Sequence, residues 1–367
     1  MRGQRMRDGL RQAWANHRHL VALAVLLFVG NQALEWAILQ GLGASHAQLC
    51  RHDCGWYTSV MDHGYQRTPS GHARRDAANW AFFPAFPWVA KGVGLALNLP
   101  AATAAVVTSK AFLLLAVFAF MKLGALYLPR LPALALGAVV AFSPYALYGN
   151  VGYTESMFLF VSCVFFILLK QERHLAAGLV GGVLSAVRVV GLFAFVSYLV
   201  TMVRDVRQRR PVAWDARLFG ALLIPLGLAC FMLHLHSVMG DALAFSHVQV
   251  AWGRSVGNPL RVLFLGALGG GFSQYLVVTV LLALGAVGFC WRRNMPELAA
   301  FTLFGIGLPL FAGLLSMPRF VFWQAPVLLL LAHLVSTGRV WLVALPLCTL
   351  GQVVMYMGWF SGKTWTF

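Results

Sequence analysis

Residues 50–65, CRHDCGWYTSVMDHGY, form a polar and charged stretch in a chain that is otherwise mostly apolar. The stretch contains two carboxylates, Asp53 and Asp62. Only 11 Asp and Glu occur in the 367 residues, against 28 Lys and Arg, and 60% of the residues are hydrophobic. Carboxylates are therefore scarce, and a reaction that needs a base has few candidates in this chain.

The rest of the chain is dominated by apolar runs of about 20 residues, the length that crosses a bilayer as a helix. Together with a mean hydropathy of +0.74, these runs exclude a soluble fold and predict an all-α polytopic membrane protein. We expect about 10–11 transmembrane helices in a single integral membrane domain, 1–367. The net charge of +17 lies in short loops between apolar runs, so it indicates topology and not a nucleic-acid-binding surface.

Basic residues predict the orientation of the chain. Residues 1–19 are rich in Arg and precede an apolar run at 20–39, so the positive-inside rule places this terminus in the cytoplasm. The run is long enough to span and no clean small-residue cleavage site follows it, which favours a first span over a signal peptide. Residues 41–100 then form the first extracytoplasmic loop with interfacial helices, 101–357 form the transmembrane bundle, and 358–367 form an extracytoplasmic tail.

One apolar region, 175–202, is too long for a single span and carries Arg188 at its centre. The basic segment RDVRQRR at 204–210 follows it and is expected on the cytoplasmic side, so both ends of the region lie on the same side. Two short helices hinged near Arg188 satisfy this requirement. Other crossings are expected at 101–128, 133–148, 153–169, 217–239, 273–291, 298–315, 320–335 and 340–356.

One outer loop with a carboxylate, outward-facing Arg residues and abundant Trp and Tyr fit the transfer of a sugar from a lipid phosphate. The leaving phosphate ester is weakly basic, so its departure needs cations, while the attacking hydroxyl needs one base. We expect Asp53 as the general base, with Arg319 and Arg188 binding the donor phosphate. Asp62 is the alternative base, but it would lie half a turn out of phase with Asp53 on a continuous helix. No metal or other cofactor is expected.

Further substrate-binding candidates lie in outer loops or at the outer ends of spans. They are Arg51, Tyr153, Glu155, His247, Gln249, Trp252 and Arg254. Several assignments have structural alternatives that the residues leave open. Asp53 can pair with Arg51 or cap a helix, and Glu155 can cap the following span. Arg188 suits either a lipid phosphate or a pair with Glu155, and Arg319 lies where lipid headgroups are alternative partners.

Two cysteines, Cys50 and Cys54, flank Asp53 on the side of the membrane that is expected to be oxidising. A disulfide that braces the loop is one alternative for them. A zinc site that includes the nearby histidines is another, although the spacing matches no strong ligand pattern.

Six segments of the chain also resemble a known family. In order they read RHDCGWYTSVMDHGY, AFFPAFPW, SPYALYGNVGYTESMFLF, AGLVGGVLSAVRVVGL, GDALAFSHVQVAWGR and SMPRFVFWQAPVLLLLAHL, and they run from about residue 50 to 335. Together they are similar to the PIG-V type (GPI mannosyltransferase 2-like) of mannosyltransferase, which adds the second mannose in glycosylphosphatidylinositol assembly. The chain departs from the family pattern at His52 and Cys54, where an aromatic and a small residue are common, and its shortness suits a bacterial relative.

The resemblance implies a GT-C glycosyltransferase fold and an inverting transfer from a polyprenyl (dolichyl) phosphate donor, with the catalytic Asp of the first outer loop at Asp53. The expected sugar is mannose, and the expected acceptor is an extracytoplasmic lipid or glycan hydroxyl. Expected partners are this donor, the acceptor and membrane lipids, with no nucleic acid and the oligomeric state left open.

The site is expected to face outward from the cytoplasmic membrane of a bacterium, or to lie in the endoplasmic reticulum membrane of a eukaryote. Two other function classes remain as alternatives. One is a transporter or a lipid or glycan flippase, which predicts paired inverted repeats that the sequence does not display. The other is a catalytically silent GT-C-like scaffold.

Overall fold

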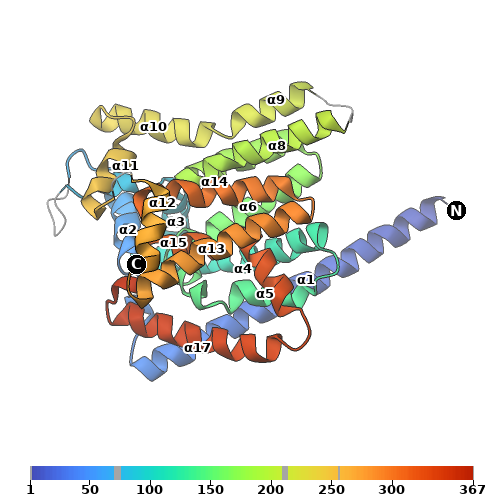
Figure 1. Ribbon diagram of the computed structural model, residues 1–367, viewed down its shortest axis with the longest axis horizontal. Coiled ribbons are helices and arrows are strands. Elements are labelled where there is room, and N and C mark those ends of the chain that lie inside the picture. The colour runs from blue at the N-terminus through green and yellow to red at the C-terminus, as the bar shows by residue number, and fades with distance from the viewer. Residues whose placement is uncertain (1, 70–75, 209–213, 255–256, 367) are drawn as a thin grey trace.

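The computed structural model describes residues 2–69, 76–208, 214–254 and 257–366, and within these ranges every regular element is a helix. Residues 209 and 210 of the predicted cytoplasmic segment, and both terminal residues, lie outside the described ranges. Figure 1 shows an elongated bundle in which α2 (Asp53–His63) and α11 (Ala244–His247) lie at one end. The start of α1 (Arg2–Leu42), the end of α8 (Ala194–Arg207) and the start of α9 (Trp214–Leu223) lie at the other. The all-helical architecture predicted from the apolar runs is confirmed.

The α-helices are α1 (Arg2–Leu42), α2 (Asp53–His63), α3 (Ala85–Leu97), α4 (Ala101–Tyr127), α5 (Ala133–Ala141), α6 (Glu155–Lys170), α7 (His174–Val187), α8 (Ala194–Arg207), α9 (Trp214–Leu223), α10 (Leu226–Met239), α11 (Ala244–His247), α12 (Pro259–Leu268), α13 (Gly271–Arg292), α14 (Pro296–Ala312), α15 (Met317–Val321), α16 (Ala325–Val335) and α17 (Trp341–Phe360). The 3₁₀ helices are η1 (His46–Gln48), η2 (Asn79–Ala81), η3 (Pro144–Gly149), η4 (Val189–Phe193), η5 (Val248–Trp252) and η6 (Thr364–Thr366).

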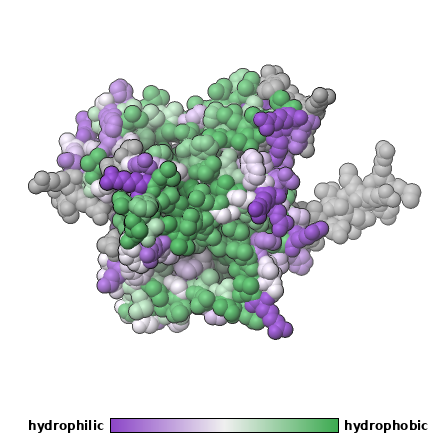
Figure 2. Space-filling model, viewed as in Figure 1, coloured by the Kyte–Doolittle hydropathy of each residue, from purple (hydrophilic) through white to green (hydrophobic). Residues whose placement is uncertain are grey.

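Six helical segments among the described residues are long and apolar enough to cross a membrane. They are Arg18–Leu42, Ala101–Tyr127, Val189–Arg207, Ala216–Met239, Gly271–Arg292 and Trp341–Phe360. Shorter apolar helices, among them α7, α14 and α16, lie between them. Figure 2 shows hydrophobic residues across the middle of one face and hydrophilic residues gathered towards its two ends. This distribution is that of a multi-pass membrane protein, as the sequence predicts.

The region around Arg188 contains the break that its charge predicts. Helix α7 ends at Val187, the backbone at Arg188 is extended, and η4 leads into α8. Helix α7 packs closely on α9 because both carry glycine at the contact: a Cβ added to Gly178 would lie 2.2 Å from the carbonyl oxygen of Gly220. Small residues at a helix crossing let two backbones approach in this way.

Three other predicted spans contain a helix break that the sequence does not predict, although 217–239 still lies within one segment long enough to cross a membrane, Ala216–Met239. The run 133–148 is divided into α5 and η3, the run 217–239 into α9 and α10, and the run 320–335 into parts of α15 and α16. A proline lies at each break, namely Pro144, Pro225 and Pro326. Proline supplies no amide hydrogen and clashes with the preceding turn, so it begins a new helix and does not continue one. Helix α12 was not expected at all.

The core is centred on α4, which packs against α1, α3, α5 and α6. Fully buried aromatic side chains such as Phe120, Phe165 and Phe166 fill the space around it. Helix α2 rests on α3 and α4, so the polar stretch at 50–65 is supported by the middle of the bundle. The segment from Gly149 to Glu155, which joins η3 to α6, lies next to α2 and brings a second carboxylate to the same place.

Candidate functional site

Asp53 is the first residue of α2, and its side chain is 24% exposed. Its backbone N–H donates a hydrogen bond to the hydroxyl of Tyr153 at 3.0 Å. The preceding residue, His52, has a positive φ of 55°, a backbone conformation that is rare outside glycine and often found at functional sites. The positive end of the helix dipole favours a carboxylate at this position. The structure therefore holds the Asp53 side chain partly open to solvent at the start of a helix.

Arg319 is the partner of Asp53. One of its terminal nitrogens, Nη1, donates to Asp53 Oδ2 at 2.7 Å, although the two residues are 266 positions apart in sequence. Arg319 lies in the short helix α15, which begins after Ser316 and has proline in its first turn. Its guanidinium group also lies 4.8 Å above the ring of Tyr153, so an aromatic face contributes to its binding.

Glu155 connects Arg319 to a second arginine. Its Oε1 atom lies 2.5 Å from Arg319 Nε and also accepts a hydrogen bond from Arg188 Nη2. Arg188 Nε donates to Thr154 Oγ1 at 2.7 Å. The side chain of Glu155 is fully buried, whereas Arg188 and Arg319 are each 10% exposed. Arg188 is thus paired with Glu155, one of the two partners that the sequence suggests for it.

These four groups form a cluster of balanced charge, which we call the ion cluster: Asp53, Glu155, Arg188 and Arg319. They come from α2, α6, the α7–η4 junction and α15, four segments that are distant in sequence. Two carboxylates and two guanidinium groups sum to no net charge. Buried ions need such pairing because the cost of removing each one from water is large. The second carboxylate oxygen of Glu155 has no hydrogen-bond partner among the described residues.

The segment around η5 lies beside this cluster. Arg254 donates from Nη1 to Gln249 Oε1 at 2.8 Å and from Nη2 to Ser316 Oγ at 3.1 Å, three residues before Arg319. The ring of Trp252 lies 5.8 Å from that of Trp56, which is one helical turn from Asp53. The structure thus brings Gln249, Trp252 and Arg254 next to the elements that carry Asp53 and Arg319.

Three residues singled out in the sequence lie elsewhere. Arg51 does not pair with Asp53; its Nη1 donates to the carbonyl oxygen of Phe360 at 3.0 Å. His247 is exposed and contacts Asp241 at 2.7 Å. Asp62 is exposed near the other end of α2 from Asp53. Neighbours in sequence diverge here because the turn before α2 directs the Arg51 side chain towards α17.

The two cysteines that flank Asp53 are joined in a disulfide. Of the two alternatives that the sequence leaves open, the structure therefore contains the covalent brace. A disulfide has no thiolate to offer, so these two residues are not zinc ligands.

Several contributors to the site were not identified from the sequence. Tyr57 lies one turn after Asp53 and donates to Thr154 Oγ1 at 3.4 Å. Burial raises the pKa of Tyr57 to about 12, so it remains a neutral donor. Phe320 and Tyr148 place their rings against the guanidinium groups. A usable signal existed for Tyr57, which lies at i+4 from Asp53, the spacing at which helical side chains share a face.

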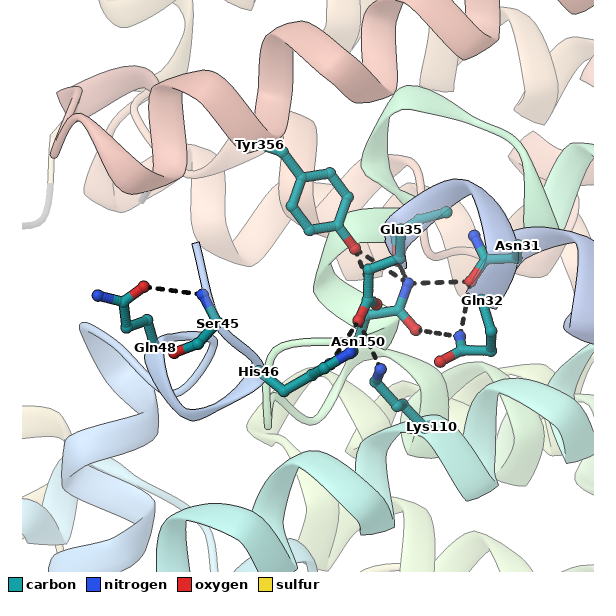
Figure 3. Close-up of polar contacts among 10 residues, drawn as sticks. Asn31, Gln32, Glu35, Ser45, His46, Gln48, Lys110, Asn150 and Tyr356 are labelled. Atoms are coloured by element: carbon teal, nitrogen blue, oxygen red, sulfur yellow. Dashed lines mark hydrogen bonds and ion pairs between the residues drawn. The ribbon is translucent and has the colours of Figure 1, made fainter. Parts of the chain in front are cut away.

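A second polar network holds Asn150, which lies in the segment from Gly149 to Glu155 (Figure 3). Lys110 Nζ lies 2.6 Å from Glu35 Oε1, and the hydroxyl of Tyr356 donates to Glu35 Oε2 at 3.1 Å. Asn150 donates to Tyr356 Oη at 3.3 Å and to Asn31 Oδ1 at 3.0 Å. Because Glu35 and Lys110 neutralise each other, two charges that the sequence places at membrane depth are both accounted for.

No family model matches this chain, and no curated protein matches it. Solved structures of an oligosaccharyltransferase from Archaeoglobus fulgidus are similar to it at low identity. The apo form has 12% identity and a TM-score of 0.49, covering 96% of this chain and 56% of that one. The form in complex with an inhibitory peptide and a dolichol-phosphate has 11% identity and a TM-score of 0.45, covering 97% and 55%. The chain thus spans about half the length of these structures, and at these scores the similarity assigns it neither a family nor an activity.

Proposed function

We propose that this protein is an integral membrane glycosyltransferase of the GT-C type. It moves a hexose, with mannose as the expected sugar, from a polyprenyl (dolichyl) phosphate to a lipid or glycan hydroxyl, with inversion at the anomeric carbon. The observation that carries the proposal is the partly exposed Asp53 carboxylate, held at a helix start against the guanidinium group of Arg319. A base and a phosphate-binding cation are thereby neighbours in a bundle of membrane helices.

The proposed step uses Asp53 as the general base. The acceptor hydroxyl gives its proton to the Asp53 carboxylate while its oxygen forms a bond to the anomeric carbon. The bond from that carbon to the phosphate oxygen breaks, and the lipid phosphate leaves with the electron pair. Arg319 and Arg188 stabilise the negative charge that develops on this phosphate. Since guanidinium groups supply this positive charge, the proposal requires no metal or other cofactor.

The balance of charge in the ion cluster suggests an order of events. While Arg319 is paired with Asp53, its guanidinium group occupies the carboxylate oxygen Oδ2. A donor phosphate adds a negative charge and competes with Asp53 for the guanidinium group. Donor binding would therefore release Asp53 to accept a proton. Glu155 continues to orient Arg319 and Arg188 during the exchange.

The acceptor is proposed to approach past Trp56, Trp252 and Gln249, where aromatic faces can stack on a sugar ring. Arg254, which contacts both Gln249 and Ser316, adds positive charge on this side. Tyr153 contributes through its hydrogen bond to Asp53. His247 and Arg51 are left with an outer role in substrate binding, because their side chains contact Asp241 and Phe360.

The proposed setting is a membrane whose outer side is oxidising, with the site facing outward. This is the cytoplasmic membrane of a bacterium or the endoplasmic reticulum membrane of a eukaryote. The disulfide at Cys50 and Cys54 supports this orientation, because disulfides persist outside the reducing cytosol. Membrane lipids surround the bundle, and nucleic acid has no part in the reaction.

The test is transfer by purified protein in lipid nanodiscs, supplied with polyprenyl phosphate sugars and membrane lipids. The product is identified by its mass. Wild-type protein is expected to add one hexose to an acceptor, and Asp53→Asn is expected to lower the rate by roughly 10²-fold or more. Donor binding should be retained or tightened in that variant, because Arg319 loses a competing charge.

Asp62→Asn is the matched control, since it makes the same change at an exposed position near the other end of α2. It should transfer sugar at the wild-type rate. Wild-type turnover by Asp53→Asn would show that Asp53 is not the base. In sealed proteoliposomes, movement of the intact donor across the bilayer, with no change in its mass, would instead identify a flippase.

A further inference from the structure

We propose that the disulfide between Cys50 and Cys54 positions the general base, Asp53, for sugar transfer. This role goes beyond bracing the loop. The inference rests on the proposed function, because it concerns the placement of Asp53 relative to Glu155 and Arg319. It assigns a role to the bridge and to Gly152, on which Cys54 packs. Three observations lead to it.

The first observation is what the bridge encloses. Only Arg51, His52 and Asp53 lie between the two cysteines, whose Cα atoms are 5.2 Å apart. His52 has the positive φ of 55°, a conformation that persists only where the surrounding structure imposes it. Cys54 is in the first turn of α2, so the bridge fixes the direction in which the chain enters the helix at Asp53.

The second observation is where the bridge lies. Cys54 is fully buried, and a Cβ added to Gly152 would lie 2.7 Å from its sulfur atom and 3.3 Å from the Cβ of Ala105. The sulfur therefore packs directly on the backbone of Gly152, where a side chain would not fit. Gly152 also has a positive φ of 77°, which favours glycine at this position.

The third observation is that Gly152 precedes the residues that contact Asp53. Tyr153 accepts the backbone N–H of Asp53, and Glu155 meets the guanidinium group that Asp53 also meets. The start of α2 and the start of α6 are thus joined by the sulfur contact, by a hydrogen bond and through Arg319. These three links are non-covalent, whereas the disulfide is a covalent restraint within residues 50–54 that acts on Cys54, the residue next to Asp53.

The bridge is poorly suited to stabilise the whole fold. A disulfide stabilises a protein mainly by restricting the unfolded chain, and the effect is smaller for shorter loops. This one joins residues only four positions apart. Its consequence is therefore local: it sets the angle and distance at which Asp53 presents its carboxylate. Displacement of a reacting group by about 1 Å can lower a rate by about 10²-fold.

The first experiment compares sugar transfer before and after reduction with dithiothreitol, which supplies two electrons and two protons and is itself oxidised to a cyclic disulfide. The bridge becomes two thiols, and mass spectrometry measures how complete the change is. For wild type we expect kcat to fall at least roughly tenfold while KM for the donor stays within about twofold. A purely stabilising bridge would lower the apparent Tm and leave kcat unchanged in the protein that stays folded.

The matched variants are Cys50→Ser/Cys54→Ser and Cys230→Ser. The first should match reduced wild type and should not respond to dithiothreitol. The second removes an exposed free cysteine and should behave as wild type. In addition, Gly152→Ala should lower kcat more in wild type than in the double serine variant, because the smaller oxygen atom relieves the contact with the added methyl group.

Hydrogen exchange separates the failure of this inference from the failure of the proposed function. Reduction should raise amide exchange at 51–57 and 152–156 and leave the core of α4 unchanged. If oxidised wild type transfers no sugar, the proposed function fails, and exchange alone then decides the role of the bridge. Unchanged kcat in fully reduced active protein, or unchanged exchange in inactive protein, would overturn the inference.

Discussion

At the scale of single residues, Glu155 is the group on which the ion cluster depends. Its Oε1 atom contacts both Arg188 and Arg319, and the side chain is fully buried. Loss of one partner from a buried ion pair costs about 3–5 kcal/mol, because the remaining charge is left without compensation. We therefore expect Glu155→Gln to lower the apparent Tm in detergent clearly and to lower sugar transfer with it.

The matched control is Glu172→Gln, which makes the same change in an exposed turn between α6 and α7. Its effect should stay within about 0.5 kcal/mol. A second comparison uses Arg188→Met as the background, in which Glu155→Gln should cost less because one of the two buried cations has been removed. Equal costs with and without Arg188 would show that the two side chains are not coupled.

His52 predicts a pH dependence. Partial burial lowers the pKa of His52 from its usual 6.5, although the neighbouring Asp53 charge acts in the opposite direction. The unfolded chain therefore binds a proton more readily than the folded one. The contribution of His52 to the free energy of unfolding is complete above pH 6.5. It is lost as the pH falls below 6.5 towards the folded-state pKa of His52. The chain contains ten other histidines, so the comparison is with His52→Asn.

The measurement is the apparent Tm of both proteins between pH 5 and pH 8. Wild type should lose more stability than His52→Asn on the acid side of about pH 6.5. Parallel curves for the two proteins would show that the pKa of His52 is the same in the folded and unfolded states.

The scarcity of carboxylates is what allowed single residues to be identified from the sequence. With 11 Asp and Glu in the chain, Asp53 and Glu155 stand out without any structure. Their partners do not, because nothing in the pattern of residues joins Asp53 to Arg319, 266 positions away. Arg51 is adjacent to the turn that starts α2, yet its side chain contacts Phe360. Pairing between residues distant in sequence depends on tertiary packing, which the local pattern of residues does not predict.

At the scale of helices, the sequence predicts the helix break at a charged residue but not the helix breaks at proline. The division of 175–202 follows from the cost of Arg188 in a membrane. At Pro225 and Pro326 the residues on both sides are apolar, and at Pro144 only Ser143 interrupts the apolar residues, so the hydrophobic run continues across a helix end. At Pro225, Ser185 of α7 supports the break: its hydroxyl donates to the carbonyl oxygen of Ile224 at 2.7 Å and accepts the N–H of Leu228 at 3.2 Å.

The contact between α7 and α9 supplies a prediction at this scale. Gly178→Ala would place a methyl group 2.2 Å from the backbone of Gly220, so the helices must separate and nearby packing is lost. Overpacking of this kind costs about 1–3 kcal/mol. The expected result is a lower apparent Tm in detergent.

Gly288→Ala in α13 is the control, because no atom lies within 4 Å of its added Cβ. Alanine there should be neutral or should stabilise the helix by about 0.5–1 kcal/mol, since glycine is the poorer helix former. If Gly178→Ala is tolerated as well as Gly288→Ala, the close approach of α7 to α9 is not required.

At the scale of the whole molecule, the distribution of charge predicts which end of the bundle faces the cytoplasm. Figure 1 places α2 and α11 at one end, and the start of α1 and the end of α8 at the other. The basic N-terminal segment and the basic end of α8 therefore share an end, as the positive-inside rule predicts for the cytoplasm. The ion cluster contains the first residue of α2 and lies towards the opposite end, where a donor with an outward-facing headgroup would meet it.

Labelling of single cysteines tests this orientation. The background replaces Cys163, Cys230, Cys290 and Cys348 with serine and keeps the disulfide, which does not react with maleimides. His46→Cys and Gln208→Cys are then introduced at exposed positions at the two ends. An impermeant maleimide on intact cells should label position 46 directly and position 208 only after the membrane is opened. Glu172→Cys should behave like position 208, because the start of α7 and the end of α8 are expected on the same side of the membrane. Labelling of positions 46 and 208 from one side would contradict the predicted crossings. If only position 208 were labelled from outside, Asp53 would face the cytoplasm. The reducing environment there would not preserve the disulfide beside it.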